Sequence, residues 1–154
     1  MGAISPDPRE AQRTAAIISA AMIMSVVMYG VLVNLFRVTS ADPFEGFVRP
    51  TPVLAVRTAL WGAAALALAA IPFVRRALLA RRANEDEGRV VARLGVCSIV
   101  TNALAEVPAL LGFVLVALSG LYVDFYVLAA ISILQMLRYF PRPGAWQEWL
   151  KQRP

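Results

Sequence analysis

Four long apolar blocks, separated by short segments that hold nearly all of the charge, dominate the pattern of this chain. The blocks span residues 14–36, 52–74, 94–118 and 121–140. An α-helix needs about 20 mostly apolar residues to cross roughly 30 Å of hydrocarbon. None of the blocks alternates apolar and polar residues as barrel strands do. The pattern therefore predicts an all-α, polytopic membrane protein, a four-transmembrane-helix bundle that forms a single membrane domain over residues 1–154.

The segments after the third and fourth blocks add detail to this bundle. Only Ser119 and Gly120 link the last two blocks, so those helices are predicted to be antiparallel neighbours. The run 141–144 contains two prolines and a glycine, which end a helix. Trp146 and Trp149 then share one face of residues 144–151, which predicts a short C-terminal interfacial helix lying on the membrane. A helix that docks a partner protein is the alternative interpretation.

The charged residues predict how the bundle is oriented in the membrane. Apolar residues make up 59% of the chain and charged residues 16%, far from the roughly 25% charged of soluble domains. Four crossings place both chain ends and the middle loop on one side, which carries twelve of the fifteen basic residues. Basic residues concentrate on the cytoplasmic side of membrane proteins. Both termini are thus predicted to be cytoplasmic, and the net charge of +5 is explained by contact with lipid headgroups, without a nucleic-acid partner. Arginine outnumbers lysine 14 to 1, which suggests a GC-rich bacterial genome and hence the cell inner membrane.

Several residue types needed for catalysis or metal binding are absent or scarce. The chain has no histidine, the usual proton shuttle and the commonest metal ligand. Its single cysteine, Cys97, lies in an apolar block and has no ligand partners, so it is interpreted as a packing residue. No paired carboxylates, nucleophile elbow or phosphate loop is present. We therefore expect no enzymatic activity, no catalytic residues, no metal site and no cofactor.

Glu106 is the strongest candidate functional residue. It is the thirteenth residue of the 25-residue block 94–118, close to the centre of the predicted span. A charge there costs roughly a few kcal/mol, so the carboxyl must face other helices or water and is most easily carried in its neutral form. Thr101 and Asn102 lie about one turn away, and Pro108 frees the carbonyl oxygen of residue 104. We expect Glu106, Asn102 and Thr101 to bind or exchange H⁺ or Na⁺, the alternative being that Glu106 only makes an interhelical hydrogen bond.

The remaining polar and small residues predict packing. Ser25 and Tyr29 are interpreted as packing residues with satisfied hydroxyls, and Asp124, near the outer interface, as a solvated residue. Small residues let helices approach closely in lipid. Gly62 and the alanine-rich stretch that follows it therefore favour a tight bundle or a homo-oligomer. Gly30, Gly112 and Pro108 are likewise predicted to serve helix packing.

The segment 103–118, ALAEVPALLGFVLVAL, resembles the second helix of the c subunit, or proteolipid, of rotary ATP synthases. That family shows an essential carboxylate followed six residues later by a glycine, and Glu106 and Gly112 have this spacing. The resemblance covers residues 58–118, including a preceding helix rich in small residues and a polar loop. It implies that Glu106 is the ion-carrying carboxylate of an oligomer. In the first block, Tyr29 and Gly30 are similar to the family's aromatic–glycine pair.

Three functions are compared on these residues. The first is an ion-handling membrane protein in which Glu106 exchanges H⁺ or Na⁺. The alternative is a structural or accessory subunit of a membrane complex, bound to partner helices. A small multidrug exporter is disfavoured, because that family carries its acid in the first helix and the first block here has none.

Overall fold

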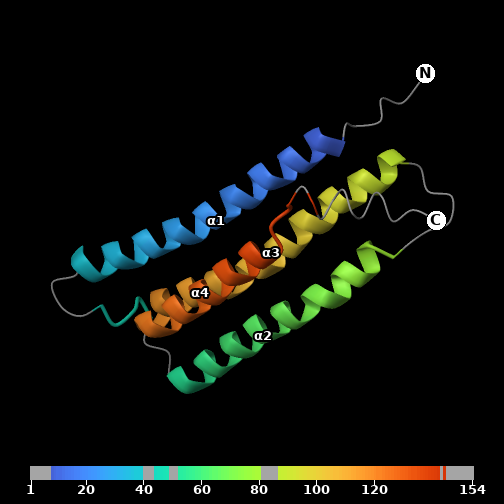
Figure 1. Cartoon of the computed structure of the whole chain (residues 1–154). Helices are drawn as coiled ribbons and strands as arrows, with labels where there is room; N and C mark the ends of the chain where they lie inside the picture. Colours follow the sequence, from blue (N-terminus) through green and yellow to red (C-terminus); the bar gives the residue numbers. More distant parts are fainter. Residues whose placement is uncertain (1–7, 40–43, 49–51, 81–86, 143, 145–154) are drawn as a thin grey trace.

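Four α-helices make up the regular structure of this computed structural model over the residues it describes, 8–39, 44–48, 52–80, 87–142 and 144. They are α1 (Pro8–Thr39), α2 (Val53–Leu78), α3 (Glu87–Ser119) and α4 (Tyr122–Arg138) (Figure 1). The prediction of an all-α protein is confirmed. Three helices, α1, α2 and α3, are long and apolar enough to cross a membrane, which supports a membrane location and a multi-pass protein.

The fourth helix is shorter than the other three. Its 17 residues extend over about 26 Å at 1.5 Å per residue, a little less than the usual thickness of the hydrocarbon core. The expected interfacial helix over 144–151, with Trp146 and Trp149, lies outside the described residues except for Gly144.

Three of the four helices extend beyond the apolar blocks that predict them. The first helix begins at Pro8 instead of Thr14, and α3 begins at Glu87 instead of Leu94. Hydropathy locates the part of a helix that lies in hydrocarbon, whereas arginine, glutamate, glutamine and alanine continue a helix readily in water. The extra turns of α1 and α3 carry residues of these types. The bounds of the apolar blocks are therefore not the bounds of the helices.

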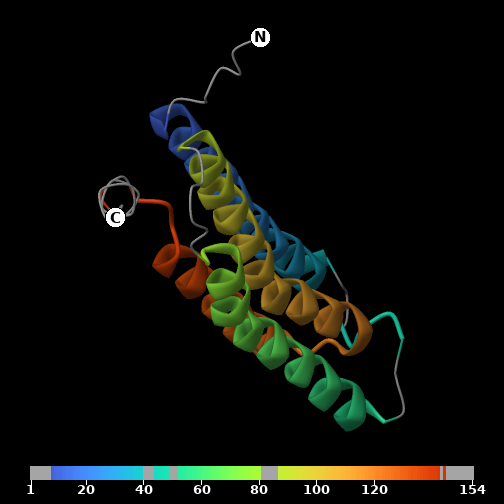
Figure 2. The same cartoon turned by 90° about the vertical axis from the view of Figure 1, so that its right-hand side faces the viewer.

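The third helix occupies the centre of the fold. It packs against α1, α2 and α4, and α1 also packs against α4. Figure 1 shows α1 and α2 on opposite sides of the α3–α4 pair, and Figure 2 shows α3 running beside α1 along most of its length. A polar residue on α3 can therefore meet side chains from any of the other helices.

The buried core lies mainly between α1, α3 and α4. Its largest members are Phe125 and Met136 of α4 and Ile71 of α2, all at most 2% exposed. Many large apolar side chains of α1 and α2 point outward instead, Val38 and Leu66 among them, which suits helices surrounded by lipid.

Residues 44–48, which follow α1, contact the turn between α3 and α4. The backbone N–H of Phe47 donates to the carbonyl of Ala117 at 2.7 Å. Gly46 and Gly120 have φ angles of 96° and 64°, values that side-chain-bearing residues rarely adopt. A Cβ on Gly46 would collide with the backbone of Leu118, so both glycines are required for this close contact.

Candidate functional site

The carboxyl group of Glu106 lies at the interface between α3 and α1, where two hydroxyl groups meet it. Ser25 Oγ is 2.5 Å and Tyr29 Oη is 3.0 Å from Glu106 Oε1. Ser25 and Tyr29 are four residues apart on α1 and therefore share one face of that helix. The ring of Tyr29 is fixed in turn by Phe113 of α3, with ring centroids 5.7 Å apart. Packing and hydrogen bonds together place both hydroxyls at the carboxyl.

The hydroxyl of Ser25 has two possible acceptors but a single proton. Besides Glu106 Oε1, it lies 2.7 Å from the carbonyl oxygen of Met22 in its own helix. If Glu106 is ionised, Ser25 donates to the carboxylate. If Glu106 is protonated, the carboxyl can donate to Ser25 Oγ while Ser25 donates to Met22. The same three oxygens therefore accommodate both protonation states of Glu106 with only a hydroxyl rotation.

The second oxygen of the carboxyl group is not held in this way. Among the described residues, Glu106 Oε2 has no hydrogen-bond partner, and the side chain as a whole is only partly buried. Glu106 is thus hydrogen-bonded through one oxygen, while the other has no partner among the described residues and is not fully enclosed.

The two polar neighbours expected to join Glu106 are placed elsewhere. Asn102 is fully buried and its Nδ2 donates to Ser19 Oγ of α1 at 2.6 Å. Thr101 is also fully buried, with its Oγ1 4.0 Å from Cys97 Sγ. The spacing from Asn102 to Glu106 does put them on one face of α3, but a partner on the facing helix takes the amide. The structure therefore brings Ser25 and Tyr29 to the carboxyl, and not Thr101 and Asn102.

Among the residues expected to serve helix packing, Gly112 makes a close helix–helix approach within the chain. A Cβ on Gly112 would lie 3.1 Å from Phe125 Cα and 3.2 Å from Leu128 Cβ of α4. Cβ atoms on Gly30 and Gly62 would meet nothing within 4 Å, so any packing role for these two needs a contact outside the chain and stays a prediction. Pro108 is buried inside α3, and the N–H of the next residue, Ala109, donates to Ser132 Oγ of α4 at 2.9 Å.

A second carboxylate, Asp124, is buried and joins α2 to α4. Its side chain is 5% exposed, against the expectation of a solvated residue. Arg57 donates to Asp124 Oδ1 from Nε at 3.2 Å and from Nη2 at 2.9 Å, and Trp61 Nε1 donates to the same oxygen at 3.0 Å. The two helices bring opposite charges to the same end of the bundle, so the carboxylate is neutralised and buried.

Sequence reasoning missed both sets of partners although signals for them were present. Ser25 and Tyr29 are two hydroxyl-bearing residues four apart in an otherwise apolar helix. Arg57 and Asp124 are opposite charges near the same ends of two predicted spans. The sequence does not show which face of each helix points toward its neighbours, because α3 is apolar around most of its circumference.

No family model, curated protein or solved structure matches this chain. The function is therefore argued from the chain's own residues.

Proposed function

We propose that this protein is a multi-pass protein of the cell inner membrane that binds an exchangeable proton at Glu106, with the hydroxyls of Ser25 and Tyr29 as its partners. The observation that carries the proposal is a carboxyl group in the middle of a helix long and apolar enough to cross a membrane, with one oxygen hydrogen-bonded and the other unpartnered and not fully enclosed. A sealed carboxyl could only tie helices together, whereas an accessible one can gain and lose a proton.

The proposal includes a fourth crossing by α4 and cytoplasmic termini. The 17 residues of α4 approach the thickness of the hydrocarbon core, and α4 packs beside α3 through Gly112 and Phe125. The excess of basic residues at both chain ends and in the middle loop favours this orientation. In the same arrangement, Trp146 and Trp149 would anchor the C-terminal segment at the membrane surface.

The arrangement of oxygens favours a proton over Na⁺. A bound Na⁺ would need several oxygen ligands, and the expected additional ligands, Thr101 and Asn102, make their contacts elsewhere. A proton needs only the rotation of the Ser25 hydroxyl between Glu106 and Met22. Na⁺ is therefore the less favoured of the two ions.

A homo-oligomer would fit the resemblance of residues 58–118 to the proteolipid hairpin. Gly62 lies on an exposed face of α2 with open space around it, as a close contact with a second copy requires. Glu106 would then exchange its proton at, or near, a boundary between copies.

The second candidate is a structural or accessory subunit, favoured by the two hydroxyls that already hold Glu106 Oε1 to α1. In that case the carboxyl only ties α3 to α1. Glutamine keeps hydrogen-bonding capacity, so Glu106→Gln would be harmless under this alternative.

The test is labelling of the purified full-length chain with a fluorescent carbodiimide at increasing pH, with the modified residue mapped by mass spectrometry. Carbodiimides modify protonated carboxyls in apolar surroundings, so labelling of Glu106 should be strong in mild acid and decline as pH rises. Asp124 is the control within the same chain, because its buried carboxylate is paired with Arg57 and should stay unlabelled. Tyr29→Phe removes one of the two hydroxyls that hold Oε1 and should change the extent of labelling, whereas added Na⁺ should not protect.

An unreactive Glu106 in protein whose helical circular dichroism is intact would contradict the proposal and favour the accessory subunit. Protection by Na⁺ would instead reverse the choice of ion.

A further inference from the structure

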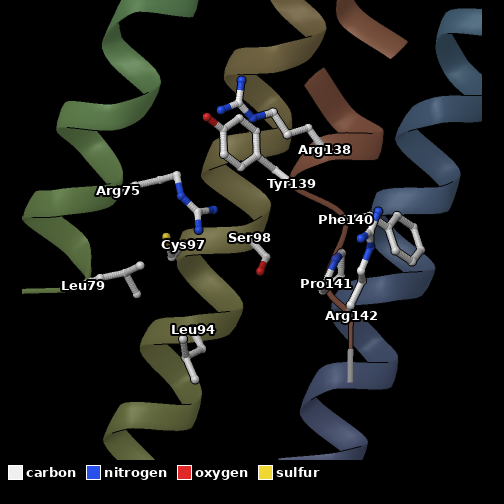
Figure 3. A pocket seen from close by; sticks show the side chains of 10 residues that line it. All are labelled: Arg75, Leu79, Leu94, Cys97, Ser98, Arg138, Tyr139, Phe140, Pro141 and Arg142. Carbon is white, nitrogen blue, oxygen red and sulfur yellow. The ribbon is translucent and has the colours of Figure 1, made fainter. Parts of the chain in front are cut away.

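A pocket of about 250 Å³ opens where the end of α4 meets α2 and α3. Figure 3 shows its lining side chains coming from three segments: the last turns of α2, the first half of α3, and residues 138–142 at the end of α4. The segment after α4 is held in place by Gln12 of α1, whose Nε2 donates to the carbonyl of Pro141 at 3.2 Å. The pocket is therefore built by the fold and does not depend on one mobile side chain.

The charged side chains that the described part of the chain brings to this pocket are all positive. Arg75, Arg138 and Arg142 line it, and no carboxylate is among the described lining residues. Figure 3 shows the guanidinium groups of Arg75 and Arg138 reaching toward the ring of Tyr139 from different helices. Their Cζ atoms lie 4.7 Å and 5.6 Å from the ring centroid. The aromatic ring holds two like charges close together, leaving their outer N–H groups available for an anion.

The hydroxyl of Ser98 adds a directional donor to the pocket. Ser98 is 8% exposed and lines the pocket, and its Oγ makes no hydrogen bond to any residue that the structure describes. In Figure 3 its side chain lies on α3 between the guanidinium of Arg75 and the segment that contains Pro141 and Arg142. The Ser98 hydroxyl therefore borders the pocket with its hydrogen-bonding capacity unused by any described residue, and it is placed to contact a bound molecule.

We propose that this pocket binds a phosphate group, held by the three arginines and by Ser98. The guanidinium group of arginine presents two parallel N–H donors that match two oxygens of a phosphate, and its charge makes these hydrogen bonds stronger than those of neutral donors. The pocket lies beside Arg75, in the last turn of α2, and Arg138, in the last turn of α4, where helices leave the hydrocarbon and meet lipid headgroups. Basic pockets between membrane helices recognise anionic headgroups. The phosphodiester of an anionic lipid and a free phosphate share this chemistry, and the experiment distinguishes them.

The experiment measures binding of two probes to the purified full-length chain in a neutral detergent. Native mass spectrometry counts phosphatidylglycerol adducts, with phosphatidylcholine as the zwitterionic comparison, and calorimetry measures inorganic phosphate. We expect one anionic lipid per pocket, and Arg142→Gln should weaken it by about tenfold, the typical effect of losing a hydrogen bond between charged groups. Ser98→Leu fills the pocket without changing the charge and should weaken binding to a similar extent.

The matched control is Arg76→Gln, because Arg76 is an exposed neighbour of Arg75 that does not line the pocket. It removes the same charge and should change binding by less than about twofold. Binding of inorganic phosphate alone, with the same dependence on Arg142 and Ser98, would support the site and identify its source as soluble. If the folded protein binds neither probe, or if Arg76→Gln weakens binding as much as Arg142→Gln does, the proposal is wrong. Glu106→Gln should leave this binding unchanged, so the two proposals stand or fall separately.

Discussion

The buried carboxylate of Asp124 offers a quantitative test of how α2 is held to the rest of the bundle. Three donor atoms, two from Arg57 and one from Trp61, converge on Asp124 Oδ1. The change to make is Asp124→Ala, which removes the acceptor, compared with Asp124→Asn, which keeps an oxygen for Trp61 but removes the charge.

The expected cost follows from the exposure of each partner. The Arg57 side chain is 49% exposed, so its ion pair with Asp124 is screened and contributes at most about 1 kcal/mol. The Trp61 N–H is partly buried and donates to a charged group, a bond that contributes about 1.5–3 kcal/mol in soluble proteins and at most about 1.7 kcal/mol in membrane bundles. We therefore expect Asp124→Ala to lower the free energy of unfolding by about 2–3 kcal/mol and Asp124→Asn by about 1 kcal/mol.

The assay is equilibrium unfolding in mixed micelles of increasing denaturing detergent, followed by circular dichroism. Val123→Ala is the control, because Val123 is the preceding residue and is 76% exposed; it should change stability by less than about 0.5 kcal/mol. Trp61→Phe should cost about 1.5 kcal/mol alone and nothing further in the Asp124→Ala background, since the bond is already lost. Equal stability of Asp124→Ala and Val123→Ala would refute the reasoning, as would additive effects of the Asp124 and Trp61 changes.

Two further predictions concern the contact between α3 and α4. Gly112→Ala should destabilise the bundle by about 1–3 kcal/mol, because its Cβ would press on the backbone of Phe125. Gly95→Ala in the same helix is the control, because its Cβ meets nothing, and it should be neutral or stabilising. The same detergent titration compares the two variants, and a stable Gly112→Ala would mean that α4 does not pack at this distance. Ser132→Ala should lower the free energy of unfolding by about 0.5–1.5 kcal/mol, because the hydrogen bond from the Ala109 N–H is lost. Thr58→Ala should cost little, because the Thr58 hydroxyl is exposed and bonds only its own helix. Hydrogen exchange at Ala109 should rise in Ser132→Ala alone, and unchanged exchange there would contradict the assignment.

The number and order of the helices could be predicted from the sequence, whereas the partners of the polar residues could not. Apolar length alone locates the helices, because few other structures bury so many consecutive apolar residues. The interior contacts depend on how far each helix is turned and shifted against its neighbour. Asn102 illustrates this, because its position one turn from Glu106 is correct while its amide bonds Ser19 of another helix.

The burial of Asp124 shows a second limit of the same kind. Its place near the end of a span suggested contact with water, as for most aspartates. The opposite charge of Arg57 and the N–H of Trp61 change that outcome, but both depend on α2 lying beside this end of α4. The position of Asp124 near the start of the fourth helix could be predicted, and the identity of the neighbouring helix could not.

The central position of α3 also sets an order of events during synthesis. Ser25 and Glu106 are separated by 81 residues, so at about 5–20 residues per second the ribosome needs roughly 4–16 seconds between them. During that interval α1 is already made, and its serine hydroxyl can turn to the carbonyl of Met22. Glu106 has no such substitute within α3 among the described residues, so it enters the membrane as the costly member of the pair. The first helix is therefore complete before its partner in α3 is made, and the contact between Ser25 and Glu106 can form only after α3 has been synthesised.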